Sequence, residues 1–260
     1  MKTEAWTQAV RHQLDLGRLL PLGGPDDGTW ITEQAAVQAL GRAAAGIPGV
    51  RLGTLRIGSA PPEPVSESAV PPPAVPPPVS ALPPGPLKIE AAFTAPLGQP
   101  LPETADQLRS TLLHAAAERL GLATVTADLR VTDLHEGPET GVKSRTTARP
   151  TRSAPEAAAA RSSPPVTGAG SMRGLAGELA DVATGVPGVA RLTAVLGSRP
   201  VRTEGHDDPP GRHIEIQFAV AAGHHPREVA RAVREAVGAA ATSGTAGPVT
   251  VAVLITDTAA

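Results

Sequence analysis

The chain contains one short sequence twice, and this repeat constrains the fold more than any other feature. Residues 46–50 are Gly-Ile-Pro-Gly-Val, and residues 185–189 are Gly-Val-Pro-Gly-Val. A second match relates residues 88–93 to residues 213–218. Internal repeats indicate duplicated structural units. We therefore expect two tandem domains that share one order of helices and strands.

The hydrophobic pattern predicts the order helix, strand, strand, helix, strand in each unit. Thr32 can cap the first helix, and Pro102 suits the first turn of the second helix, which Gly121 can end in the left-handed conformation. The strands of the first unit are expected at residues 50–57, 87–95 and 125–131. The last of them is expected to bury four side chains, Val125, Ala127, Leu129 and Val131.

This order predicts an α+β fold of two tandem α-β-β-α-β units, each a three-stranded sheet with two helices on one face. The opposite face of each sheet is then open to the sister domain, another subunit or a partner. Leu254 stands where the first copy has Arg130. Because an apolar residue replaces a charge on that face, we expect the far face of the second sheet to be partly covered.

The predicted domain organisation has four parts. Residues 1–28 form an N-terminal helical arm, 29–135 the first domain, 136–170 a disordered linker and 171–260 the second domain. The arm places Trp6, Val10 and Leu14 on one helical face. This face either packs on a folded domain or binds a partner, with Trp6 as the anchor.

A proline-rich insert occupies residues 59–86. The second copy has a short loop at the same place, residues 198–211, between the corresponding strands. The insert is therefore predicted to lie within the first domain as a solvated loop biased to the polyproline II conformation. The alternative is a proline-rich ligand for an aromatic-lined groove.

The amino-acid composition further limits the classes of function that we expect. The formal net charge is −2, which gives no electrostatic reason to expect nucleic-acid binding. Cysteine is absent, and only 2% of the residues are aromatic, so the cores must be mainly aliphatic. The sequence has no apolar run of the ~18–20 residues that span a bilayer and no signal-peptide pattern. We therefore expect a cytoplasmic protein without direct membrane insertion.

Candidate chemistry is sparse. A histidine and carboxylate group before and within the middle strand of the second unit offers metal-ligand types, although a solvated loop is the favoured interpretation. Its members are His206, Asp207, Asp208 and His213. The first copy has Lys88 in place of His213, and lysine is not a ligand here. We expect no catalytic residues, no cofactor and no enzymatic activity. The element order also suggests K-homology RNA-binding domains, but the Gly-x-x-Gly loop and basic groove of those domains are not visible.

The repeated unit resembles the alkaline shock protein family of bacterial stress and envelope proteins. The similarity rests on the Pro-Gly-Val sequences at 48–50 and 187–189, on Gly98 and Gly223, and on the closing Thr-Asp pairs at 132–133 and 256–257.

The family resemblance implies a non-enzymatic role in stress or cell-envelope homeostasis, often at the membrane through a protein partner. We therefore expect an interaction or scaffold protein that acts through its exposed sheet faces and N-terminal arm, with self-association as a further option. The opening residues also resemble actinobacterial chains of the nucleopolyhedrovirus fibrillar protein family, which implies no function.

Overall fold

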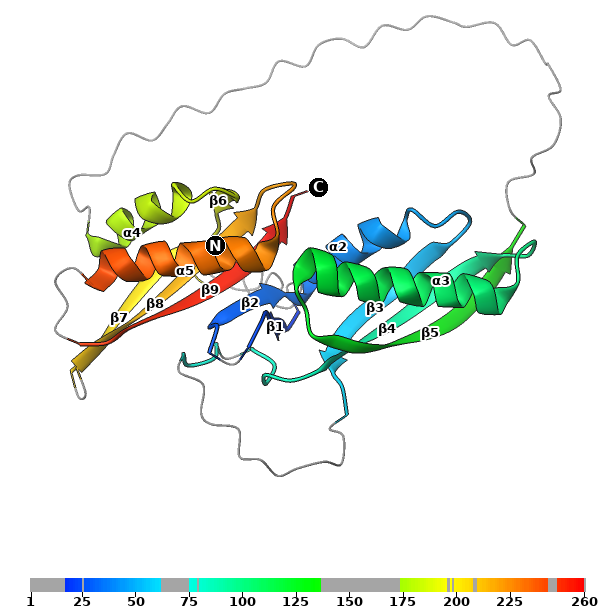
Figure 1. The fold of residues 1–260 in the computed structure, drawn as a ribbon, viewed down its shortest axis with the longest axis horizontal. Coiled ribbons are helices and arrows are strands. Elements are labelled where there is room, and N and C mark those ends of the chain that lie inside the picture. Colours follow the sequence, from blue (N-terminus) through cyan, green and yellow to red (C-terminus); the bar gives the residue numbers. More distant parts are fainter. Residues whose placement is uncertain are drawn as a thin grey trace, which may run out of the picture.

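Helices and strands form two β-sheets with helices packed against them, which confirms the predicted α+β class (Figure 1). The computed structural model describes residues 17–24, 26–61, 75–78, 80–136, 174–195, 197, 199–207, 210–242 and 247–259. The predicted linker at 136–170 lies outside these residues except for residue 136, as do Trp6, Val10 and Leu14 of the predicted arm.

The first sheet has the strand order β3-β4-β5. Strands β3 (Arg51–Ser59) and β4 (Leu87–Pro96) are antiparallel, and β5 (Thr124–His135) runs parallel to β4. Helix α2 (Glu33–Ala44) precedes the sheet, and helix α3 (Leu101–His114) with the π-helical turn η1 (Ala115–Leu120) connects β4 to β5. The proline-rich insert thus connects two strands that pair in one sheet.

The second sheet has six strands rather than the three that the sequence predicts. Its path is β1-β2-β9-β8-β6, and β7 also pairs with β8. Two strands come from the N-terminal part of the chain, and two short strands, β6 and β7, replace one predicted strand along β8. The strands are β1 (Leu19–Pro21), β2 (Thr29–Thr32), β6 (Val189–Leu192), β7 (Val201–Asp207), β8 (Pro210–Val220) and β9 (Val249–Thr258). Its helices are α4 (Leu175–Thr184) and α5 (Pro226–Thr242).

Local sequence explains where several elements begin and end. The Thr32 hydroxyl accepts a hydrogen bond from Ala35 N at 3.3 Å and caps α2 as predicted. Gly121 ends η1 with φ 76°. In the repeated Pro-Gly sequence, Gly49 and Gly188 have φ 74° and 94°, and a Cβ on either would lie within 2.8 Å of a neighbouring side chain. The repeat therefore needs glycine there for both conformation and space.

The predicted N-terminal helical arm is wrong in its described part. Residues 19–21 form a strand, because Leu19 and Leu20 are both buried between β2 and other parts of the chain. The boundary at residue 29 is also wrong, since β2 lies in the sheet of the second unit. It runs parallel to β9 and pairs Trp30 with Leu254. Strand β2 has only four residues, so no local pattern indicated its pairing with β9.

The end of the proline-rich insert covers the outer face of the second sheet. We call residues 75–78 and 80–86 the proline strap. Leu19 N donates to Ser80 O (3.0 Å), and Leu82 N donates to Leu19 O (2.8 Å). Val75 packs in an apolar cluster with Leu19, Trp30, Ala252 and Leu254. The expectation that Leu254 lies under a cover is confirmed. The expectation of a solvated loop is wrong for Val75, which is buried, whereas most other described residues of the strap are exposed.

The two sheets share one hydrophobic core. A continuous cluster of buried residues includes Phe93 and Leu112 on the first sheet and its helix, and Phe218 and Val233 on the second. Helix α2 contacts both sheets, and the Arg42 guanidinium donates to the carbonyl oxygen and hydroxyl of Thr258 at 3.0 and 2.9 Å. The two sheets therefore belong to one body, and α2 packs against both of them.

A buried carboxylate connects α2 to both neighbouring segments. Glu33 is 8% exposed, and its Oε1 accepts from Ile57 N at 3.0 Å. Its Oε2 accepts from Arg18 N at 3.3 Å. Glu33 thereby satisfies an amide of the edge strand β3 and holds the chain that enters β1.

We expect Glu33→Ala to lower the free energy of unfolding by about 2 kcal/mol, because the buried amide of Ile57 loses its acceptor. Urea denaturation at 25 °C measures the change. Glu235→Ala is the matched control, since Glu235 forms an exposed pair with Arg231, and it should change stability by less than about 0.5 kcal/mol. Equal effects of the two substitutions would contradict the assigned role.

Candidate functional site

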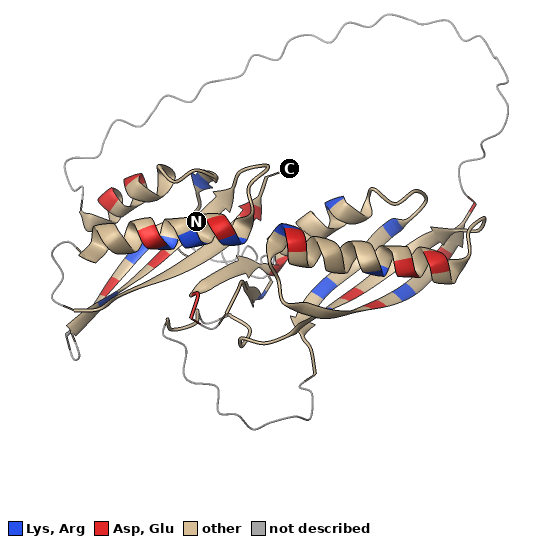
Figure 2. Cartoon of the chain, viewed as in Figure 1, with Lys and Arg blue, Asp and Glu red and all other residues tan. Residues whose placement is uncertain are grey.

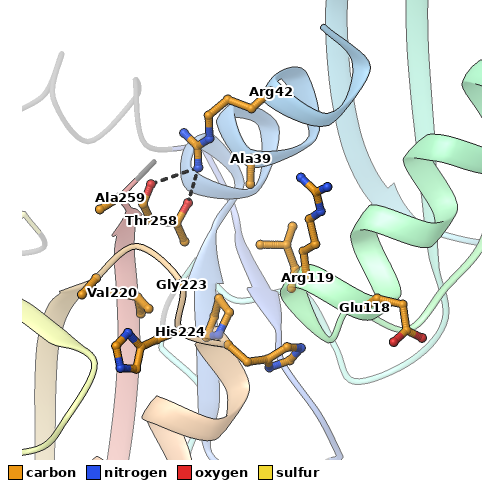
Figure 3. Close-up of a pocket in the computed structure, with 13 residues that line it drawn as sticks. Ala39, Arg42, Glu118, Arg119, Val220, Gly223, His224, Thr258 and Ala259 are labelled. Atoms are coloured by element: carbon orange, nitrogen blue, oxygen red, sulfur yellow. Dashed lines mark hydrogen bonds between the residues drawn. The ribbon is translucent and has the colours of Figure 1, made fainter. Parts of the chain in front are cut away.

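A cavity of about 520 Å³ lies where the elements packed on the first sheet meet those of the second sheet (Figure 3). Its walls come from α2, from η1, from the turn between β8 and α5, and from the end of β9. Figure 3 shows Arg42 on one wall and Arg119 on another, with His224 opposite them. The site thus depends on elements from both sheets and on the core that they share.

Basic groups dominate this junction cavity. Arg42 is held by Thr258, whereas Arg119 has no ion pair or hydrogen bond within the described residues. His224 Nδ1 lies 3.2 Å from Ala222 O. His225 packs against Gly121, and its Nδ1 is buried without a hydrogen-bond partner. Glu118 is the acidic residue of the lining and points away in Figure 3. The lining chemistry suits a small anion better than a cation.

The predicted metal ligands do not form a described site. His206 and Asp207 lie in β7, where they pair in register with Gly211 and Pro210, and Asp208 lies outside the described residues. His213 Nδ1 is 2.8 Å from the Thr250 hydroxyl. Within the part of the chain that the structure describes, no three His, Asp or Glu side chains are placed to hold a metal ion.

His213 instead lines a groove between the proline strap and the outer face of the second sheet. The groove has a volume of about 300 Å³, and its walls include Glu215 on β8 and Arg202 on β7. Burial raises the pKa of the Glu215 carboxyl, while the hydrogen bond from Gln217 and the charge of Arg202 act in the opposite direction. The ionised form of Glu215 is therefore less favoured in the folded chain than in the unfolded chain.

We expect Glu215→Gln to raise the midpoint of thermal unfolding at pH 7 to 8. The sign follows from the raised pKa, because an ionised Glu215 costs stability above that pKa. The cost disappears as the pH falls through the raised pKa toward the ordinary value of about 4.3. Melting curves from pH 4 to 8 would measure a difference that shrinks to zero at the acidic end.

The control for this titration is Glu204→Gln. Glu204 is more exposed and pairs with Arg202 at 2.9 Å, so its substitution should have little effect on the melting midpoint. A stabilisation by Glu215→Gln that does not vary with pH would contradict the assigned cause.

An apolar patch marks the free side of the first sheet. The exposed large hydrophobic residues of the described chain all lie on β5 or in the turn that bonds to it, where Leu97 N donates to His135 O. They are Leu97 (58% exposed), Val125 (56%), Val131 (38%) and Leu134 (40%). We call these four residues the β5 flank. The predicted burial of Val125 and Val131 is wrong, because β5 is an edge strand in the described structure.

Charged residues cover the outer face of the same sheet, and Figure 2 shows both signs along its strands. Lys88 on β4 lies 2.6 Å from Glu90 and 3.4 Å from Asp128 on β5. The hydrogen bond with Glu90, followed by that with Asp128, raises the pKa of Lys88. Arg130, two residues after Asp128, has no ion pair in the described part of the chain.

Sequence reasoning did not find the junction cavity or the β5 flank. Arg42 and Arg119 belong to different helical segments, and no spacing relates them to His224. The flank had one indication in the sequence, since Arg130 stands where the covered second sheet has Leu254. That difference suggested a cover on one sheet but not an exposed apolar edge on the other.

Comparisons with protein-family models, with curated proteins and with solved structures found no significant match to this chain. Among the helices described, none combines the length and the apolar character needed to cross a membrane.

Proposed function

We propose that this chain is a non-enzymatic interaction or scaffold protein that binds a protein partner through the β5 flank. The four exposed large hydrophobic residues of the described chain all lie on this strand or in the turn that bonds to its end. Exposed apolar side chains and an open strand edge both favour association with another polypeptide. This clustering is the observation that carries the proposal.

The second sheet supports the same interpretation by contrast. Its last strand, β9, is paired on its outer edge with β2, and the strand β1 lies beyond β2. Strand β5 has the corresponding place in the first sheet, and no described strand lies on its outer edge. We propose that the two units are copies of one α-β-β-α-β module and that the first copy keeps its edge for a partner strand.

The wider role follows from the family resemblance and is part of the proposal. We infer a function in bacterial stress or cell-envelope homeostasis, with the partner located at the membrane and this chain in the cytoplasm. The predicted arm residues Trp6, Val10 and Leu14 lie outside the described residues and are a second proposed contact.

Photo-crosslinking tests the proposal. A benzoylphenylalanine at Val131 should give adducts with protein in cells, and the same group at Arg231, an exposed position on α5, should not. A second substitution, Val125→Asp, should reduce the Val131 adducts at least about five-fold by removing apolar contact. Equal adduct yields at the two positions would count against the flank as the binding surface.

A nucleic-acid-binding role is the alternative, and the charge distribution favours it less. Residues of both charge signs are mixed along α3 and α5 (Figure 2). Phosphate binding relies on clustered cations and weakens steeply with salt. Salt-sensitive binding of a labelled RNA in fluorescence polarisation would support this alternative over a protein partner.

A further inference from the structure

The outer edge of β5 is contacted by a side chain of α3, and no described strand pairs with it. In the described structure, the edge receives Arg109 of α3, whose Nε donates to the carbonyl oxygen of Ala127 at 3.2 Å. This carbonyl therefore points away from β4. Because backbone groups alternate along a strand, those of Leu129 and Val131 also point outward. These three residues offer their backbone groups to an added strand.

The charges beside this edge are unbalanced within one copy. Glu90 and Asp128 lie opposite each other on β4 and β5 and share the single cation of Lys88. Arg130 lies on the same strand as Asp128, is exposed, and has no ion pair among the described residues. One carboxylate thus lacks a full partner, and one guanidinium is available two residues away.

We propose that the protein forms a two-fold symmetric dimer in which β5 pairs antiparallel with β5 of a second copy, with Leu129 on the axis. In this register Asp128 lies opposite Arg130 of the second copy, and the same pair forms again across the axis. Both pairs are of the non-hydrogen-bonded kind, in which side chains approach most closely. Shifting the register by two residues either way places Asp128 opposite Asp128 or Thr132 of the second copy and loses both pairs.

The same register satisfies the backbone and the apolar side. Ala127 lies opposite Val131 of the second copy, and the outward backbone groups of residues 127, 129 and 131 face one another. The half-exposed Val131 gains an apolar neighbour on each side of the axis. Arg109 must release the Ala127 carbonyl before a second copy can bind to that carbonyl. Its hydrogen bond therefore competes with the pairing of the two β5 strands and weakens dimerisation. The inference rests on the proposed function, because it uses the β5 flank and names its occupant.

Sedimentation equilibrium of the full chain tests the dimer and its register. The wild type should shift from 26.3 kDa toward twice that mass over about 1–200 µM. Asp128→Arg or Arg130→Asp places like charges across both pairs and should weaken dimerisation at least about ten-fold. The double variant Asp128→Arg/Arg130→Asp restores opposite charges and should recover affinity to within about three-fold. Arg56→Asp on β3 makes the same charge change away from the interface and should have no effect.

Two further variants make the test independent of the charges. Arg109→Gln removes the competing hydrogen bond to the Ala127 carbonyl and should strengthen dimerisation. Leu129→Cys places two thiols on the axis of a chain with no other cysteine, and mild oxidation should join them, because paired Cα atoms there lie about 5.5 Å apart. Cysteine at Arg56 should not crosslink.

A monomer at every concentration, a larger oligomer, or single charge reversals without rescue in the double variant would overturn the inference. Crosslinks from Val131 to a different protein, with a monomeric wild type, would overturn the dimer and leave the proposed function standing. Loss of both crosslinks and dimer would remove both proposals.

Discussion

Replacing Leu254 with arginine should lower the free energy of unfolding by about 4 kcal/mol or more. Leu254 is fully buried on the outer face of the second sheet, between Trp30 and Val75 of the proline strap. The substitution removes a large apolar contact and places a charge where the described neighbours are apolar. Urea denaturation measures the loss, and Trp30 reports it because its ring is in the same cluster.

The reciprocal substitution is the matched control. Arg130→Leu makes the opposite exchange at the corresponding position of the first sheet, where the side chain is exposed. We expect it to change stability by less than about 0.5 kcal/mol at about 1 µM chain, where the proposed dimer is dissociated, as is usual for exposed positions. If Leu254→Arg lowered the free energy of unfolding by less than about 1 kcal/mol, the proline strap would not keep this face of the sheet buried.

Truncation of either large core aromatic residue should destabilise the whole molecule. Phe93 in the first sheet and Phe218 in the second are both fully buried in the continuous core. Substitution by alanine leaves a cavity and is expected to cost about 3–5 kcal/mol. Because α2 packs on both sheets, each variant should still unfold in one transition, at a lower denaturant concentration.

Far-ultraviolet circular dichroism and Trp30 fluorescence distinguish this outcome from independent domains. In a Trp6→Phe background the fluorescence of Trp30 reports the second sheet, so Phe93→Ala should move its transition as far as Phe218→Ala does. If Phe93→Ala left the fluorescence transition in place and split the dichroism curve, the two sheets would unfold independently, and the shared core would not couple them.

The sequence predicted the elements that have strong local patterns. Alternation identified β4, and the cap at Thr32 and the stop at Gly121 were found at their residues. These features depend on neighbours within a few positions, so they can be predicted from one chain. Prediction failed where distant partners decide the structure. Leu19 and Leu20 form a strand because β2 pairs with them and the proline strap forms hydrogen bonds to Leu19. The local hydrophobic pattern contains no information about these distant partners.

The candidate surfaces show the same limit. Val125 and Val131 alternate like buried residues, yet their exposure depends on whether another strand lies beside β5. Arg42 and His224 line one cavity only because α2 packs across both sheets. The packing of α2 across both sheets cannot be predicted from the spacing of these residues in the sequence.

The pairing of β2 with β9 has a consequence for synthesis. The parallel partners Ile31 and Ile255 are far apart in the sequence, and the whole first sheet is translated between them. During synthesis the strands of the first sheet can pair once β5 has emerged from the ribosome, whereas β1 and β2 must wait for β9. The nascent chain therefore exposes an unpaired apolar strand, to which chaperones can bind, until β9 has been made.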